Sequence, residues 1–131
     1  MIVDTSALVA ILWREQGYEL MLDALLTEPG LLPTPARVEL ERVIAGTRRD
    51  AGADADALLN QVGVSLLPFG SDHARAATDA NGRFGIGNGG TLNMLDLMVY
   101  GCAKVERRPI LCTGRDFAAT DALIHPASRG N

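Results

Sequence analysis

The chain has 131 residues with a formal net charge of −4 at pH 7, and 47% of its residues are hydrophobic. This length supports one compact core and excludes two domains of ordinary size, so we expect a single domain over residues 1–131. The negative charge argues against nucleic-acid binding through overall positive charge, because phosphate binding depends mainly on Lys and Arg. A local patch can still bind phosphates, and the candidates are Arg48, Arg49, Arg107, Arg108 and Arg115.

Short apolar runs that suit strands alternate along the chain with segments of helical periodicity. The expected strands are residues 2–3, 31–33, 64–69, 109–112 and 122–124, and the expected helices are one from Ser6 onward, 18–26, 36–49, 54–62, 72–84 and 94–106. Strands that alternate with helices predict a parallel sheet covered by helices on both faces.

The helix expected at residues 36–49 has one apolar face and one charged face. The apolar positions are Ala36, Leu40, Val43, Ile44 and Thr47, and the charged positions are Arg37, Glu41 and Arg48. Glu39 falls at the edge of the apolar face, which distinguishes it from Glu41.

Residues 85–90 match the pattern G-x-G-x-x-G, but they follow a helical segment and not a strand. The strand context of a dinucleotide site is therefore absent, and we expect a connecting loop.

Cys102 and Cys112 lie in apolar stretches without the short spacing of metal ligands, which favours a reduced, cytoplasmic protein. The chain opens without a basic leader, and its apolar runs fall short of the roughly 20 residues that cross a bilayer. We therefore expect neither secretion nor membrane insertion.

Four acidic residues occupy positions that surface acids seldom occupy. Asp4 ends a strand, Asp116 follows a strand, Asp96 begins a helix on its core side, and Glu39 borders a buried helix face. The carboxyl ends of parallel strands lie along one edge, where ligands bind, so Asp4 and Asp116 are expected to converge there.

Crowded carboxylates repel one another, and a bound divalent cation relieves that repulsion. Oxygen ligands without Cys or His favour Mg²⁺ or Mn²⁺ over zinc. Such an ion suits phosphodiester hydrolysis, because it lowers the pKa of a bound water and stabilises charge on the phosphate.

Each acid also has an ordinary structural interpretation. Asp4 can cap the first helix, and Asp96 can complete a helix start capped by Asn93. Glu39 can pair with Arg42, and Asp116 can close a turn with Gly114. Only the joint placement of the four acids favours a functional site.

Several stretches resemble VapC-type PIN domains, in the same order and spacing over nearly the whole chain. They are residues 1–10 (MIVDTSALVA), Leu92-Asn93 followed by Asp96, residues 100–104 (YGCAK), residues 109–117 (PILCTGRDF) and Thr120-Asp121. The resemblance implies a three-layer α/β/α sandwich around a short-stranded parallel sheet, a Mg²⁺-dependent endoribonuclease and a VapB-like antitoxin that blocks its site. It also implies a homodimer.

The resemblance assigns roles residue by residue. Asp4, Glu39, Asp96 and Asp116 match the acidic quartet of the family, and Asp121 matches an alternate or fifth acid. Thr5 or Ser6, and Thr113, match hydroxyl positions that orient the carboxylates or their waters.

The resulting hypothesis is a toxin that cleaves single-stranded RNA with a metal-activated water and leaves a 5′ phosphate. Asp4, Asp96 and Asp116 would bind the Mg²⁺, and Glu39 would complete the site. The alternative is a non-catalytic PIN-like binding module that keeps the acids for structure or assembly.

Overall fold

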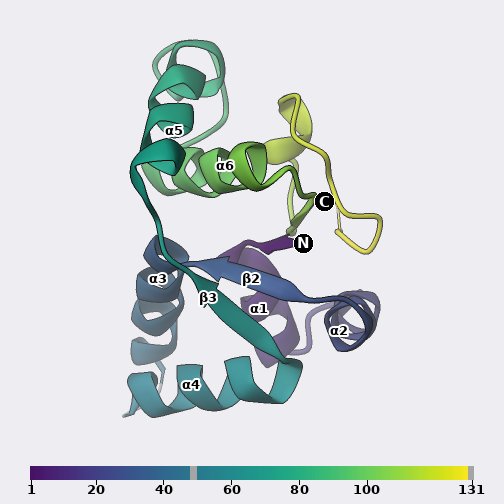
Figure 1. Ribbon diagram of the computed structural model, residues 1–131. Helices are drawn as coiled ribbons and strands as arrows, with labels where there is room; N and C mark the ends of the chain where they lie inside the picture. The colour runs from purple at the N-terminus through teal and green to yellow at the C-terminus, as the bar shows by residue number, and fades with distance from the viewer. Residues whose placement is uncertain (48–49, 130–131) are drawn as a thin grey trace.

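A parallel sheet lies at the centre of the computed structural model, which describes residues 1–47 and 50–129 (Figure 1). Within these residues the strand order is β3-β2-β1-β4, and every pairing is parallel. The strands are β1 (Ile2–Val3), β2 (Gly30–Pro33), β3 (Val64–Leu67) and β4 (Ile110–Leu111).

Helices cover both faces of this sheet. The helices are α1 (Thr5–Leu12), α2 (Tyr18–Thr27), α3 (Thr34–Ala45), α4 (Ala51–Val62), α5 (Ser71–Phe84), α6 (Met94–Glu106) and the short 3-10 helix η1 (Phe117–Ala119). Figure 1 shows α5 and α6 on one side of the sheet, with α1, α2 and α4 on the other. The expected three-layer α/β/α sandwich is therefore confirmed.

The paired strands β1 and β4 are short and wholly apolar, as expected for strands that are buried on both faces. Ile2 and Val3 of β1 and Ile110 and Leu111 of β4 are fully buried. Cys112 follows β4 into the core, and Cys102 is buried in α6, both as free thiols. Burial raises the pKa of each thiol to about 12, so both remain protonated at neutral pH.

Two of the expected helices differ clearly from the observed ones. The helix expected at 54–62 begins at Ala51, since the Asp50 side chain accepts a hydrogen bond from the Ala53 N–H at 3.2 Å. The helix expected at 36–49 begins at Thr34, with Pro35 in its first turn, and ends at Ala45. Thr47 is exposed beyond its end, which corrects the expected apolar face. Arg48 and Arg49 lie outside the described residues.

Two of the expected strands were too long, and a third does not form. The strand expected at 64–69 ends at Leu67, just before Pro68, and β4 covers only the middle of residues 109–112. The strand expected at 122–124 is wrong, because only an isolated bridge joins Ile124 to Ile110. Pro126 lacks the N–H that a longer ladder would need.

Residues 85–90 form turns between α5 and α6, as expected for a connecting loop. Gly87 and Gly89 adopt positive φ angles of 94° and 85°, a conformation that favours glycine. Among the described helices, none is both long and apolar enough to span a membrane.

Close packing of α5 against α6 depends on Gly101. A Cβ at this position would lie 2.5 Å from the His73 carbonyl oxygen and 3.0 Å from the Ala77 nitrogen. Both contacts are with backbone atoms, so the two helices would have to separate. We expect Gly101→Ala to lower the free energy of unfolding by about 1–3 kcal/mol, measured by urea denaturation.

Gly82→Ala is the matched control, because Gly82 lies in α5 and a Cβ there would meet no atom within 4 Å. This substitution should stabilise the protein by up to about 1 kcal/mol, through the higher helix propensity of alanine. Equal stability of the two variants would contradict the packing role of Gly101.

Candidate active site

The topology places the candidate site where the chain reverses its direction across the sheet. From β1 the chain moves to β2 and then to β3, with α1 to α4 in the connections, and then crosses back to β4 on the other side of β1. The crevice beyond the carboxyl ends of two such strands is the usual ligand site of an α/β fold. Asp4 directly follows β1, and residues 113–116 follow β4.

Asp4 is held rigidly at the carboxyl end of β1. Its side chain is 7% exposed and caps α1. Oδ2 accepts hydrogen bonds from the Ser6 N–H at 3.1 Å and from the Ser6 hydroxyl at 2.5 Å. Burial raises the pKa of Asp4, the hydrogen bonds from Ser6 lower it, and the charge of Asp116 raises it. The capping role expected of Asp4 is thus real, and it coexists with an electrostatic contact to another acid.

Ser6 also connects the segments that follow β1 and β4. Its Oγ accepts a hydrogen bond from the Thr113 N–H at 3.0 Å, while its hydroxyl proton is donated to Asp4. The structure therefore joins Ser6 and Thr113, two of the hydroxyl residues proposed to support the site. Thr5 instead donates from its hydroxyl to the Ala36 carbonyl oxygen at 3.0 Å, which ties α1 to the start of α3.

Glu39 lies on the side of α3 that faces Asp4. Burial raises the pKa of Glu39, the nearby polar side chain of Thr5 lowers it, and the charge of Asp4 raises it. Glu41, two residues on, is ion-paired with Arg37 at 2.8 Å and is half exposed. The helical phase that favoured Glu39 over Glu41 is consistent with these positions.

Asp96 combines the two interpretations that the sequence left open. It forms a capping box with Asn93, whose side chain accepts from the Asp96 N–H at 2.9 Å while Asp96 Oδ2 accepts from the Asn93 N–H at 3.1 Å. Burial raises the pKa of Asp96 to about 6, and the charges of Asp4, Asp116 and Glu39 contribute to the same rise. A helix-capping carboxylate would normally have a lowered pKa, so the neighbouring acids and burial outweigh the cap.

Asp116 lies at the exposed start of η1, after β4. Its main-chain carbonyl oxygen accepts a hydrogen bond from the Thr91 hydroxyl at 2.7 Å. This contact ties the segment that carries Asp116 to the loop before α6. Nothing in the residue pattern singled out Thr91, because its partner is distant in sequence.

Asp4, Glu39, Asp96 and Asp116 come from different parts of the chain and still interact electrostatically. The charge of Asp116 acts on Asp4 and Asp96, that of Asp4 acts on Glu39 and Asp96, and that of Glu39 acts on Asp96. Each of the first three has a raised pKa to which at least one other member contributes. Within residues 1–47 and 50–129, no three His, Cys, Asp or Glu side chains are already placed to hold one metal ion. The donor chemistry still fits a hard divalent cation, because the donors are carboxylate oxygens with excess negative charge. Their side chains would have to close around such an ion.

Asp121 lies in a different environment. It accepts a hydrogen bond from the Tyr100 hydroxyl at 2.5 Å and lies 3.6 Å from Lys104 Nζ. The pKa of Asp121 is lowered mainly by the bond from Tyr100, and none of the four acids contributes to that shift. The structure thus groups Asp121 with Lys104 of α6 and Arg83 of α5, and not with the acidic quartet.

Comparison with known proteins agrees with this geometry. The PIN domain family matches residues 1–123. Ribonuclease VapC42 of Mycobacterium tuberculosis is 37% identical over 131 residues, which cover 97% of this chain and 98% of that protein. A ribonuclease VapC of Mycolicibacterium smegmatis is 36% identical over 129 residues, which cover 95% of this chain and all of that protein (100%).

Solved structures share the fold at low sequence identity. A toxin-antitoxin complex from Klebsiella pneumoniae has a TM-score of 0.73 at 16% identity, covering 95% of this chain and 96% of that chain. VapBC2 from Rickettsia felis, bound to a promoter DNA fragment, has a TM-score of 0.73 at 13% identity, covering 99% and 96%. Because the PIN domain and the VapC relatives match nearly its full length, this chain belongs to the PIN-domain family and to its VapC group.

Proposed function

We propose that this chain is a metal-dependent endoribonuclease and the toxin of a VapBC-type toxin–antitoxin pair. The observation that supports it most is the electrostatics near the switch point of the sheet. Burial raises the pKa values of Asp4, Glu39 and Asp96, and the charges of neighbouring acids in the quartet raise them further. The family relationship favours RNA as the substrate and a VapB-like antitoxin as the partner. We extend the proposal to a cytoplasmic location, a homodimer and one domain over residues 1–131.

VapC-type PIN nucleases depend in general on a metal ion, and we propose Mg²⁺ here, with Mn²⁺ as a substitute. Asp4, Asp96 and Asp116 would hold the ion, and Glu39 would complete the site. The bound cation supplies an acidified water and neutralises charge on the scissile phosphate. Carboxylate oxygens without Cys or His donors suit these hard ions.

The residues around the acids prepare the site in distinct ways. Ser6 directs the Asp4 carboxylate by donating to Oδ2, and the Thr113 N–H in turn orients the Ser6 hydroxyl. Asn93 holds one oxygen of Asp96 through its N–H. Thr91 restrains the main chain at Asp116. Without a cation the carboxylates repel the phosphodiester, so productive binding of RNA at this edge depends on the ion.

The test is cleavage of a labelled single-stranded RNA by the purified chain, with Mg²⁺ or with a chelator. We expect cleavage with Mg²⁺, 5′-phosphate ends on the products and loss of activity on chelation. In cells, expression with and without the neighbouring gene, followed by mapping of RNA 5′ ends, would identify the targets and the antitoxin. The absence of both cleavage and saturable Mg²⁺ binding in calorimetry would favour a non-catalytic binding module.

A further inference from the structure

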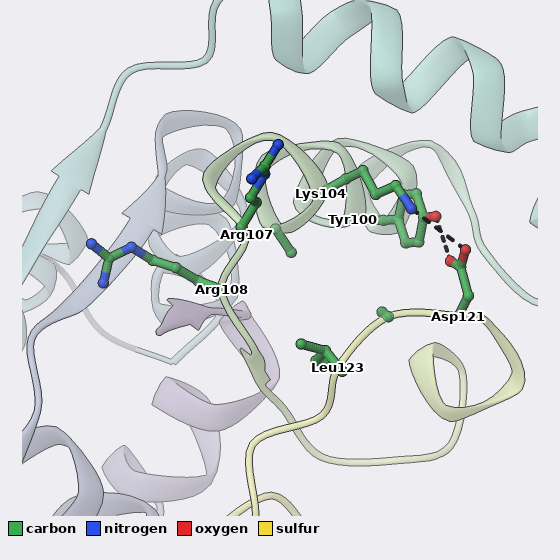
Figure 2. Close-up of a pocket in the computed structure, with 8 residues that line it drawn as sticks. Tyr100, Lys104, Arg107, Arg108, Asp121 and Leu123 are labelled. Atoms are coloured by element: carbon green, nitrogen blue, oxygen red, sulfur yellow. Dashed lines mark hydrogen bonds and ion pairs between the residues drawn. The ribbon is translucent and has the colours of Figure 1, made fainter.

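A cavity of about 300 Å³ lies between the end of α6 and residues 121–123, outside the acidic site (Figure 2). Its size is at the lower end of the range for small-ligand pockets. Its wall is mixed, since Ala103, Ala122 and Leu123 are apolar, whereas Lys104, Arg107 and Arg108 are cationic. The Tyr100 ring lines the end of the cavity that is nearest to Asp121.

Two of the three cations are not neutralised by the protein. Lys104 points toward Asp121, as Figure 2 shows, and Arg83 lies 3.5 Å from the same carboxylate. Arg107 and Arg108 leave the chain at the other end of the cavity, and neither forms an ion pair with any residue in the described part of the chain. Local positive charge therefore remains on a protein whose net charge is −4.

The backbone of Arg107 has a conformation that is unfavourable for residues other than glycine. It caps the end of α6 with φ of 55° and ψ of 49°, the left-handed region in which glycine is preferred. An arginine here keeps an exposed guanidinium, without an ion pair among residues 1–47 and 50–129, where glycine would be less strained. A strained backbone with a charged side chain at a cavity is a reason to look for a ligand.

The cavity is close to the acidic site along both α6 and β4. Tyr100 lies four residues after Asp96, which is about one turn or 6 Å along the helix, and Arg107 lies eleven residues after Asp96, which is about 16 Å. The acids lie beyond the carboxyl end of β4 and the arginines precede its amino end, and this strand has only two residues. A single strand bound at the acids can therefore continue to the cavity within a few nucleotides.

We propose that this cavity binds one nucleotide of the single-stranded RNA substrate, away from the cleaved phosphate. The two backbone phosphates that flank this nucleotide contact Arg107 and Arg108, one phosphate each, because the two guanidinium groups point in different directions (Figure 2). The nucleoside lies against the apolar wall near Tyr100. Arginine pairs well with phosphate oxygens, and the mixed wall matches a sugar and a base. The inference rests on the proposed ribonuclease function and adds to it a substrate contact outside the acidic site.

The experiment measures binding of a dye-labelled single-stranded RNA of about ten nucleotides by fluorescence anisotropy, with Mg²⁺ present and with Asp4→Asn added to every variant to prevent cleavage. The test variant is Arg107→Gly with Arg108→Gln, in which the glycine relieves the left-handed strain. We expect its Kd to rise about tenfold. The slope of log K against log salt should fall by about 1.4, because each phosphate contact on a single strand contributes about 0.7.

The matched control is Arg14→Gly with Arg75→Gln. Arg14 also has a positive φ, of 52°, and Arg75 is exposed on α5, so this variant loses the same charge and the same kind of strain elsewhere. Its affinity should stay within about twofold of the parent protein. With Mg²⁺, the test variant should raise KM for RNA cleavage and leave kcat unchanged.

An unchanged Kd and salt slope in the test variant would overturn the proposal, as would a loss of equal size in the control. If the arginine changes weakened only the antitoxin complex, the cavity would be a site for an acidic peptide, and the RNA assignment would fail. These results are separable from failure of the nuclease proposal, which would appear as absence of RNA cleavage by the parent protein with Mg²⁺.

Discussion

Asp96→Asn is expected to lower the rate of RNA cleavage by at least about 100-fold while the fold stays intact. Asparagine keeps the shape of the side chain and can still accept the hydrogen bond from the Asn93 N–H, so the start of α6 is preserved. The change removes one negative charge from the group that would hold the cation. Initial cleavage rates at saturating Mg²⁺ measure the effect, and circular dichroism verifies the fold. Asp4→Asn should behave in the same way.

Two control substitutions make this expectation specific to the site. Asp79→Asn removes a carboxylate from an exposed position of α5, so cleavage should be unchanged. Within α3, Glu39→Gln should impair cleavage, whereas Glu41→Gln should not, because Glu41 pairs with Arg37 away from the acids. Parental rates in Asp96→Asn would remove this residue from the active site, and equal effects of the two α3 changes would remove Glu39.

Mg²⁺ is expected to raise the free energy of unfolding by about 2.7 kcal/mol when its concentration is 100 times its Kd. The cation neutralises carboxylates whose mutual repulsion and burial destabilise the metal-free fold. Thermal unfolding at neutral pH, with Mg²⁺ or with a chelator, measures the difference. Asp96→Asn should remove most of the response to Mg²⁺ and should itself stabilise the metal-free protein by about 1 kcal/mol, since it removes a partly buried charge that solvent screens in part.

The pH dependence of this stability follows from the raised pKa of Asp96. Its pKa is about 6 in the folded protein against 3.8 for a freely exposed aspartate, so the folded state binds the proton more tightly than the unfolded state. The stability contributed by this proton is fully present below pH 3.8 and is lost as the pH rises through 6. Stabilisation by Mg²⁺ should increase over the same range, because the ion competes with the proton. A response to Mg²⁺ that is independent of pH would contradict this account.

The helix boundaries show which local features can be read from a sequence. The helix expected at residues 94–106 agrees with α6 at both ends. Its start could be predicted because the capping residue, Asn93, directly precedes it. The helix expected at 54–62 was placed three residues late, although Asp50 offered a similar cap at residue 51. The apolar segment at residues 122–124 is too short for its sequence pattern to distinguish a strand from the isolated bridge that Ile124 forms.

The grouping of acids depended on contacts over long separations in the chain. The order of the parallel strands could be expected to bring Asp4 and Asp116 to one edge, but it could not show that Asp121 pairs with Tyr100. The Ser6 and Thr113 hydrogen bond joins residues 107 positions apart, and the Thr91 and Asp116 bond joins residues 25 apart. Such contacts require the relative placement of helices and strands.

The amino-acid sequence alone determined the α/β/α class and the positions of the acids at strand ends and helix starts, because periodicity and capping are properties of neighbouring residues. The tertiary structure alone decided which charges share a site and which stay unpaired, since charge interactions depend on distance and burial. Asp96 and Arg107 illustrate the difference. Both lie at ends of α6. The packing of the chain raises the pKa of Asp96, and it leaves the Arg107 guanidinium beside a cavity without an ion pair in the described part of the chain.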